Sequence, residues 1–311
     1  MKEESSFSRS LKSRINSFQT SFYFLTRSPI ATAGLIIVTA YVILAIVGPI
    51  IAGGNPSIMK QYVGNVPGIG YIFNNPQPPS ARFPFGTTFE GFDIFNGILK
   101  GARLDIGVAA IIVLSGAAIG TILGSIAGYK GGVIGDVIMR VTDIFLSIPY
   151  IVLAVAFLLV FGRSLQSLVE SLIIVWWPFY TRLIRGQVLS VREQKYVEAS
   201  KAAGAGSFRT VLRHVIPNSI YPIFVQISLD FGGVILTIAS LDYLGFGFAG
   251  INLAEWGNIL GLATKGASGV LAIIYYPWTI AIPGVIILVF VLALNLLGDG
   301  LRDVTDPRLR R

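Results

Sequence analysis

The sequence contains no cysteine and a single histidine, His214. Without cysteine there can be no disulfide bond, no thiol catalysis and no cysteine–metal site, and one histidine excludes a metal site built from several histidines. Charge is also scarce: charged residues make up 13% of the 311 residues, while hydrophobic residues make up 53%. A soluble domain usually carries about a quarter charged residues. The composition therefore favours one polytopic membrane domain over two soluble domains.

The distribution of the bases argues for a membrane and against nucleic acid. The formal net charge is +8, but the bases gather at the edges of long apolar runs, as in the cytoplasmic loops of membrane proteins. We therefore expect the lipid bilayer as a partner and no nucleic acid. Residues 1–28 are polar, and the apolar run after them is too long for the apolar part of a cleavable signal. We expect 1–28 to be a cytoplasmic tail.

Six apolar runs are long enough to cross a bilayer, which takes about 20 helical residues. The predicted fold class is an all-α polytopic membrane protein with six transmembrane helices in one domain, 29–311. The predicted spans are about 29–52, 104–128, 136–161, 168–189, 219–247 and 277–298. Pro178 is expected to kink the fourth span. Two long outside loops are expected at 53–103 and 248–276, and AEWGNIL in the second suggests a short interfacial helix.

The positive-inside rule orients these spans. An even number of spans puts both termini on one side, and with the termini inside, the cytoplasmic segments carry 18 of the 24 bases. Cytoplasmic loops carry the excess of Lys and Arg. The rule therefore predicts a multi-pass protein of a prokaryotic cytoplasmic membrane with both termini, and the loop 190–217, in the cytoplasm.

The loop 190–217 is predicted to form a helix–turn–helix beneath the membrane. Gly204 and Gly206 permit a turn, and Ser207 is a candidate N-cap for the second helix. An apolar stripe follows at i, i+3, i+4 and i+7, made of Phe208, Val211, Leu212 and Val215. Pro217 is expected to end or kink this helix. The residues alone leave two readings open: a surface for docking a rigid partner, or a plain interfacial hairpin stabilised by lipid head groups.

The same loop resembles the EAA loop of ABC importer permeases. The stretch EASKAAG followed by HVIP matches that loop at Glu198, Ala199, Gly204, Ile216 and Pro217. Ser200 stands where the family has its second alanine, and His214 where it usually has isoleucine. RHVIPN (213–218) is similar to the dipeptide/oligopeptide branch, as are 85–109, 241–260 and 295–310. The whole looks most like the second permease subunit of that branch.

Two positions depart from the branch, and the branch is not confined to peptides. Thr88 replaces its usual acidic residue and Phe92 its usual arginine. Because the branch also includes importers of oligosaccharides, these departures leave two substrate classes open, peptides and oligosaccharides.

The resemblance implies the transmembrane domain of a type I ABC importer, with a coupling-helix hairpin between spans 4 and 5. Such a permease binds no cofactor; ATP and Mg are bound by two cytoplasmic ATPase subunits. The sequence agrees, since it has no G-x-x-x-x-G-K-[ST] phosphate loop. The other implied partners are a second, homologous permease and an extracytoplasmic solute-binding protein. The resemblance assigns ATPase coupling to Glu198, Ala199, Ser200, Ala203, Gly204 and Pro217.

Acids within the spans suggest further sites. Asp230 lies deep in the fifth span and could line the pathway, because an acid in a membrane is a functional suspect by default. Asp242, near the outer end, is expected to be hydrated or paired. An ion-coupled secondary transporter is a different-class alternative, but one deep acid and no evident inverted repeat give it little support. No residue set resembles a catalytic constellation, so we expect a non-catalytic subunit.

Overall fold

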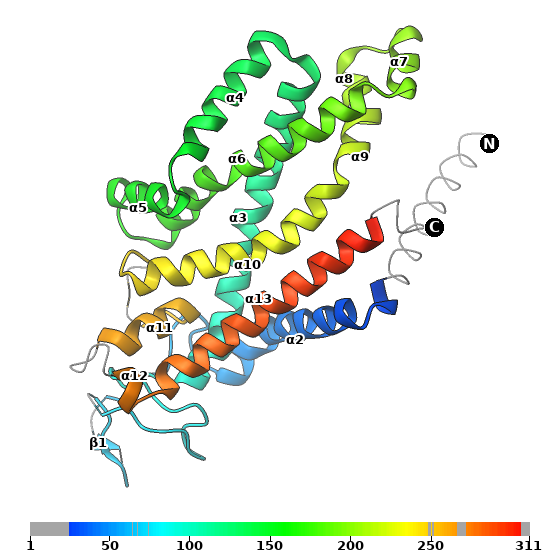
Figure 1. The fold of residues 1–311 in the computed structure, drawn as a ribbon. Helices are drawn as coiled ribbons and strands as arrows, with labels where there is room; N and C mark the ends of the chain where they lie inside the picture. The colour runs from blue at the N-terminus through cyan, green and yellow to red at the C-terminus, as the bar shows by residue number, and fades with distance from the viewer. Residues whose placement is uncertain are drawn as a thin grey trace.

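The computed structural model describes residues 25–63, 65–66, 68–73, 75–247, 250, 252–265 and 272–305. Most of the predicted tail, residues 1–24, lies outside this range. The long helices are α2 (Pro29–Ala52), α3 (Ile94–Lys130), α4 (Gly132–Ser147), α5 (Tyr150–Phe161), α6 (Leu165–Arg192), α10 (Tyr221–Tyr243) and α13 (Trp278–Thr305). The short helices α7 (Lys195–Ala202) and α8 (Ser207–Thr210) lie at one end of the bundle. The elements α11 (Trp256–Lys265), α12 (Ala272–Tyr275) and β1 (Asn65–Val66) lie at the other (Figure 1).

In the part of the chain that the structure describes, four helices are long and apolar enough to cross a membrane: α2, α3, α10 and α13 over Trp278–Asp303. The bent pair of α4 and α5 makes a fifth span if it is counted as one. The predicted fourth span, 168–189, falls within α6, which is not in this set. Glu170, Arg182 and Arg185 all lie on α6 and make it more polar than the other long helices. The structure is thus an all-helical membrane bundle with four or five candidate spans.

The third predicted span is not one straight helix. Between α4 and α5 the helix axis turns by 91°. The turn lies at Ile148 and Pro149, where Ile148 adopts an extended conformation with φ −100° and ψ 133°. A residue before proline is disfavoured from helical angles by the proline ring. The predicted span over 136–161 is therefore divided in the structure into α4 and α5. By contrast, α6 continues through Pro178.

A ladder of four glycines joins α3 to α6. Gly116, Gly120, Gly124 and Gly128 recur every fourth residue on α3, and each faces the helix made by 176–188. A Cβ added at Gly124 would lie 2.5 Å from the Thr181 carbonyl oxygen. Small residues at this spacing let two helix backbones approach closely in a membrane, where van der Waals packing drives helix association.

On the other side of α3, aromatic side chains connect α2, α13 and α11 (Trp256–Lys265). The Tyr41 ring stacks on Phe290 with ring centroids 4.7 Å apart, and it meets Trp256 edge-on at 5.8 Å. The Tyr41 hydroxyl donates to the Ile286 carbonyl at 2.8 Å. These rings form the part of the core that holds the first and last long helices together. Buried aromatic pairs stabilise a fold by more than the burial of their surface area alone.

The two predicted outside loops pack against each other. Met59 N–H donates to the Asn252 carbonyl and Ala254 N–H to the Ser57 carbonyl, at 2.8 and 2.9 Å. The first loop also contains the antiparallel strands β1 (Asn65–Val66) and β2 (Gly70–Tyr71), a small departure from the all-α prediction. The α3 helix begins at Ile94, ten residues before the predicted span, because Asp93 caps it by accepting from Asn96 N–H at 3.1 Å.

Candidate functional site

The predicted coupling loop forms a hairpin at one tip of the molecule. It consists of α7 (Lys195–Ala202), α8 (Ser207–Thr210), the π-helical turn η1 (Val211–Val215) and α9 (Ile216–Ser219). It stands at the end opposite the loops around α11 (Figure 1). The chain enters it directly from α6 and leaves it directly into α10. Any force on this tip therefore acts on two long helices.

The turn of the hairpin is a Schellman motif centred on Gly204. Ala205 N–H donates to the Ser200 carbonyl at 3.1 Å, and Gly204 N–H donates to the Lys201 carbonyl at 2.9 Å. Gly204 has φ +79°, which is the left-handed conformation that this motif requires and that glycine adopts without cost. The prediction of a glycine turn is confirmed at Gly204. Gly206 has φ −63°, an angle that other residues also adopt, so the backbone at this position does not require glycine.

The coupling residues predicted on α7 are presented outward. Val197 is the fully buried residue of α7 and fixes it to the bundle, while Glu198, Ala199 and Ala203 are exposed. Ser200 and Gly204 also line a polar hollow of about 620 Å³ between the two arms. Among the described residues, none forms a hydrogen bond or ion pair with the Glu198 carboxylate. The hairpin thus offers a small-residue surface with an unpaired acid.

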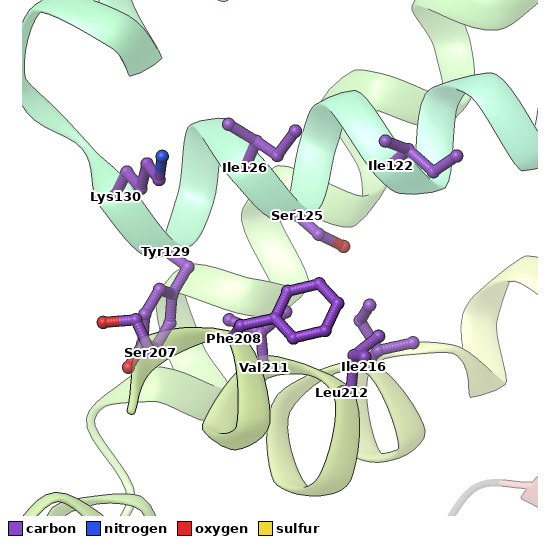
Figure 2. A pocket seen from close by; sticks show the side chains of 10 residues that line it. All are labelled: Ile122, Ser125, Ile126, Tyr129, Lys130, Ser207, Phe208, Val211, Leu212 and Ile216. Atoms are coloured by element: carbon purple, nitrogen blue, oxygen red, sulfur yellow. The ribbon is translucent and has the colours of Figure 1, made fainter. Parts of the chain in front are cut away.

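The second arm differs from the prediction in two respects. Gly206, not Ser207, is the N-cap residue of α8, and no side-chain hydrogen bond caps it. The apolar stripe is only partly covered, because Val215 is buried while Phe208 and Leu212 are 79% and 51% exposed. Phe208 and Leu212 face α3 across a pocket (Figure 2). The stripe therefore packs on the bundle at Val215 and not along its whole length.

Pro217 does not end the second arm. Proline lacks an N–H and its ring clashes with the preceding turn, and here the chain widens into η1 just before it. Ile216 N–H donates to the Val211 carbonyl, five residues back, the spacing of a π-bulge. The helix then continues as α9 to Ser219. The proline therefore accounts for the irregular helical stretch that joins the hairpin to α10.

Asp230 lies where α10 faces α6. Its Oδ1 accepts from Gln226 Nε2 at 2.8 Å, one turn earlier on the same helix. The same carboxylate also interacts with the side chains of Tyr180 and Trp176. All three of these polar atoms, Asp230 Oδ2, Tyr180 Oη and Trp176 Nε1, are buried without a hydrogen bond of good geometry among the described residues. A buried polar group left unsatisfied is costly, so this cluster has capacity for a further polar partner.

Three buried carboxyl groups meet near the opposite end, and sequence reasoning found only one of them, Asp242. Asp105 from α3, Asp242 from α10 and Glu255 before α11 are 2%, 6% and 1% exposed, and their carboxyl groups interact. Asp105 Oδ2 accepts from Trp256 N–H at 3.1 Å. Glu255 accepts from the N–H groups of Gly257 and Asn258. Two acids thus cap the N-terminus of α11 and hold it against the bundle.

This cluster must retain protons, since three adjacent buried carboxylates cannot all ionise. Burial and, next, the charge of Asp105 raise the pKa of Glu255, which lies outside the spans, to about 8. The charged groups that act on Glu255 are both acids, Asp105 and Asp242. No sequence motif signals this cluster, because its members are far apart in the chain.

We predict that the attachment of α11 weakens at alkaline pH. A carboxyl group whose folded pKa is raised contributes stability that is present below its unfolded pKa and is lost as pH rises to the folded value, here about 8. Each proton released changes the stability by about 1.4 kcal/mol per pH unit. Hydrogen exchange of the amides at 256–260 should therefore quicken from about pH 5 to about pH 8, beyond its intrinsic pH dependence, and show no further excess above about pH 8.

A Glu255→Gln variant should flatten this extra dependence, because its side chain does not titrate. The matched control is Glu170→Gln, which removes an exposed acid from α6 and should leave the dependence unchanged. Equal pH dependence of this exchange in the wild type and in Glu255→Gln would contradict the assignment of the effect to the Glu255 carboxyl group.

Comparison with known proteins identifies the kind of chain that carries this hairpin. Residues 120–311 match the family described as the binding-protein-dependent transport system inner membrane component. The matched range contains the whole hairpin and more than half of the chain. The chain belongs to this family. It is therefore a multi-pass inner membrane protein, the non-catalytic transmembrane component of a binding-protein-dependent ABC transporter.

Curated relatives of this permease span nearly its full length. The dipeptide transport system permease protein DppC of Alkalihalophilus pseudofirmus is 38% identical over 296 residues, which cover 95% of this chain and 91% of that protein. The oligopeptide transport system permease protein OppC of Bacillus subtilis is 33% identical, over 91% of this chain and 87% of that protein.

A solved structure supports the fold of the permease. A chain of the MetNI methionine ABC transporter, in an inward-facing conformation, matches with a TM-score of 0.53 at 22% identity. The match covers 67% of this chain and 96% of that chain. At this identity the likeness concerns the fold alone, and it supports the ABC importer transmembrane architecture.

Proposed function

We propose that this permease belongs to an importer of dipeptides or oligopeptides, driven by ATP that separate subunits hydrolyse. The observation that carries the proposal is the full-length similarity to permeases of dipeptide and oligopeptide transport systems. The partners would be a second homologous permease, two cytoplasmic ATPase subunits that bind ATP and Mg, and an extracytoplasmic solute-binding protein. Oligosaccharide import by the same type of transporter is the alternative that the departures at Thr88 and Phe92 keep open.

We propose that α7 is the coupling helix, seated in a cleft of an ATPase subunit. Its support is geometric: small side chains around Ala199 and Ala203 would allow close approach, and the exposed Glu198 is available for a base of the partner. The direct continuity from α6 through the hairpin to α10 gives closure of the ATPases a rigid route to the bundle. A rigid-body switch between inward-open and outward-open states is the expected consequence.

The topology proposed is six spans with both termini in the cytoplasm. Counting the bent pair α4 and α5 as one span and adding α6 gives six spans. This puts the hairpin and the α11 loops on opposite sides, in keeping with their opposite positions in the bundle (Figure 1). Two charges of α6 have partners that ease their insertion: Arg182 pairs with Asp143 of α4, and Glu170 accepts from Gln166 at 2.9 Å. An intramembrane charge is tolerated when it is paired.

We predict the labelling pattern that follows from this topology. Because the chain has no cysteine, single cysteines can be introduced without background. Cysteines at exposed positions of 53–93 should react with a membrane-impermeant maleimide in intact cells, whereas those at Ala203 and Phe208 should react only after permeabilisation. Labelling of Ala203→Cys in intact cells would overturn the topology.

We propose that Asp230 lies on the translocation pathway. It is half-buried between α6 and α10, and one of its oxygens lacks a hydrogen bond among the described residues. A substrate group could supply the missing partner. In the transport assay described next, an Asp230→Asn variant that imports at the wild-type rate would exclude this role.

The complete importer reconstituted in vesicles tests the proposed function. Import should stop when ATP is depleted and continue when the proton gradient is collapsed; the reverse result would favour an ion-coupled secondary transporter. The substrate class is decided by mass spectrometry of the ligand that co-purifies with the solute-binding protein. A peptide is the expected ligand, and an oligosaccharide would replace the proposal by its alternative.

A further inference from the structure

A pocket separates the end of α3 from the second arm of the hairpin. It has a volume of about 550 Å³ and is lined mainly by aliphatic and aromatic side chains of both elements. Ile122 and Ile126 of α3 line it together with Phe208 and Leu212 of the hairpin, and Figure 2 shows α3 and the hairpin on the two sides of the open space. Ile122, Phe208 and Leu212 are each more than half exposed. An apolar opening of this size is too costly to leave to water.

The pocket also contains a polar group without a partner. Ser125 is 3% exposed, and its hydroxyl makes no hydrogen bond among the described residues. Its oxygen projects from α3 toward the side of Phe208 (Figure 2). A buried hydroxyl usually finds a partner, so the occupant of the pocket should carry an oxygen acceptor at this depth.

Positive charge gathers where α3 ends. Lys130 is the last residue of α3 and also lines the pocket. Lys201 of α7 lies over the ring of Tyr129, another lining residue, with Nζ 5.3 Å from the ring centroid. The apolar pocket therefore has two bases at its cytoplasmic end, which is complementary to an anionic head group above an apolar chain.

We propose that this pocket binds an anionic phospholipid of the inner leaflet. Its phosphate lies by Lys130 and Lys201, the oxygen joining glycerol to the chain accepts from Ser125, and an acyl chain continues between Ile122, Phe208 and Leu212. The inference rests on the cytoplasmic placement of the hairpin. The bound lipid fills the space between α3 and the coupling hairpin and thereby stabilises the arm that the ATPase contacts.

The spacing along α3 fits this assignment. Ser125 precedes Lys130 by five residues, about 7.5 Å of helix, and Ile122 precedes it by eight, about 12 Å. Half of the hydrocarbon core is about 15 Å thick. The phosphate, the glycerol oxygen and the chain thus follow in the order in which a phospholipid presents them, within a single leaflet.

The test uses the complete importer in vesicles that contain phospholipids with a photoactivatable group in the acyl chain. The probes are phosphatidylglycerol, which is anionic, and phosphatidylcholine, which has no net charge. Mass spectrometry of digested permease should locate adducts within 122–130 and 207–216, with more from phosphatidylglycerol. Ile126→Trp, which fills the pocket, should remove most of these adducts. Lys130→Gln should lower the preference for phosphatidylglycerol about fivefold, equivalent to ~1 kcal/mol for one base at an anionic surface.

The control is Leu114→Trp, which enlarges a more exposed aliphatic side chain elsewhere on α3 and should leave the adducts unchanged. Folding is checked by the amount of intact complex recovered. The proposal is overturned if labelling at the pocket persists in Ile126→Trp or shows no preference for phosphatidylglycerol. It is also overturned if lipid adducts are absent there while crosslinks to the partner permease or to residues 1–24 are found.

Discussion

Gly204→Thr is expected to abolish most coupled transport while leaving the permease in the membrane at normal abundance. Gly204 has φ +79°, and a β-branched residue in this conformation is a genuine outlier. The left-handed conformation costs a non-glycine residue about 1–2 kcal/mol, so the hairpin should open or tilt α7 away from its docked position. A Cβ at Gly204 would meet nothing within 4 Å, which means that backbone conformation alone carries the effect.

Two variants at the same turn make this prediction specific. Gly206→Thr adds the same side chain where φ is −63°, in open space and at an N-cap, where threonine is accepted; it should transport normally. Gly204→Asn should retain much of the activity, because asparagine tolerates the left-handed region. The measurement is transport together with substrate-stimulated ATP hydrolysis by the complete importer. Equal transport by both threonine variants would show that the hairpin conformation is unimportant.

Charge reversal at Glu198 tests the contact itself. If this acid meets a base of the ATPase, Glu198→Lys should weaken recruitment of the ATPase by about 2–5 kcal/mol, since the partner's charge would be left unpaired. Glu170→Lys, at an exposed position near the other end of α6, is the control. Wild-type transport by Glu198→Lys would leave the hairpin as a membrane-surface element and remove the mechanistic centre of the ATPase-coupling proposal.

Gly120→Leu is expected to prevent stable folding of the bundle. A Cβ at this position would overlap Tyr180 Cβ and lie 2.7 Å from the Trp177 carbonyl oxygen. The backbone atoms cannot yield by a rotamer change, so α3 and α6 must separate. Overpacking typically costs about 1–3 kcal/mol, and here the loss of the neighbouring glycine contacts adds to it. The yield of monodisperse permease in detergent should fall sharply, with a lower midpoint of thermal unfolding.

Gly107→Leu provides the control on the same helix. Gly107 is exposed, and a Cβ there would meet nothing within 4 Å. The substitution should slightly stabilise the helix, because leucine has a higher helix propensity than glycine. A comparable loss of folded protein in both variants would mean that insertion, and not packing against α6, limits the yield.

The hydrophobic runs of the sequence predicted where most long helices lie, because a membrane admits only backbone segments that satisfy their own hydrogen bonds. They also separated a polar hairpin from its apolar flanks and marked Gly204 as its turn. These features depend on residues that are neighbours in the chain. The sharp bend at Pro149 was local too, and the order of Ile148 and Pro149 was a signal that the span prediction passed over.

What the tertiary structure decided depends on residues distant in the chain. In the sequence, the glycines of α3 look like ordinary small residues, and their role follows only from the packing of α6 on them. Asp105, Asp242 and Glu255 form a cluster only because α3, α10 and α11 converge. The apolar stripe on the hairpin is evident from the sequence, yet Phe208 and Leu212 border a pocket instead of packing on the bundle. Periodicity specifies the face of one helix; which surface covers that face is set by the packing of the others.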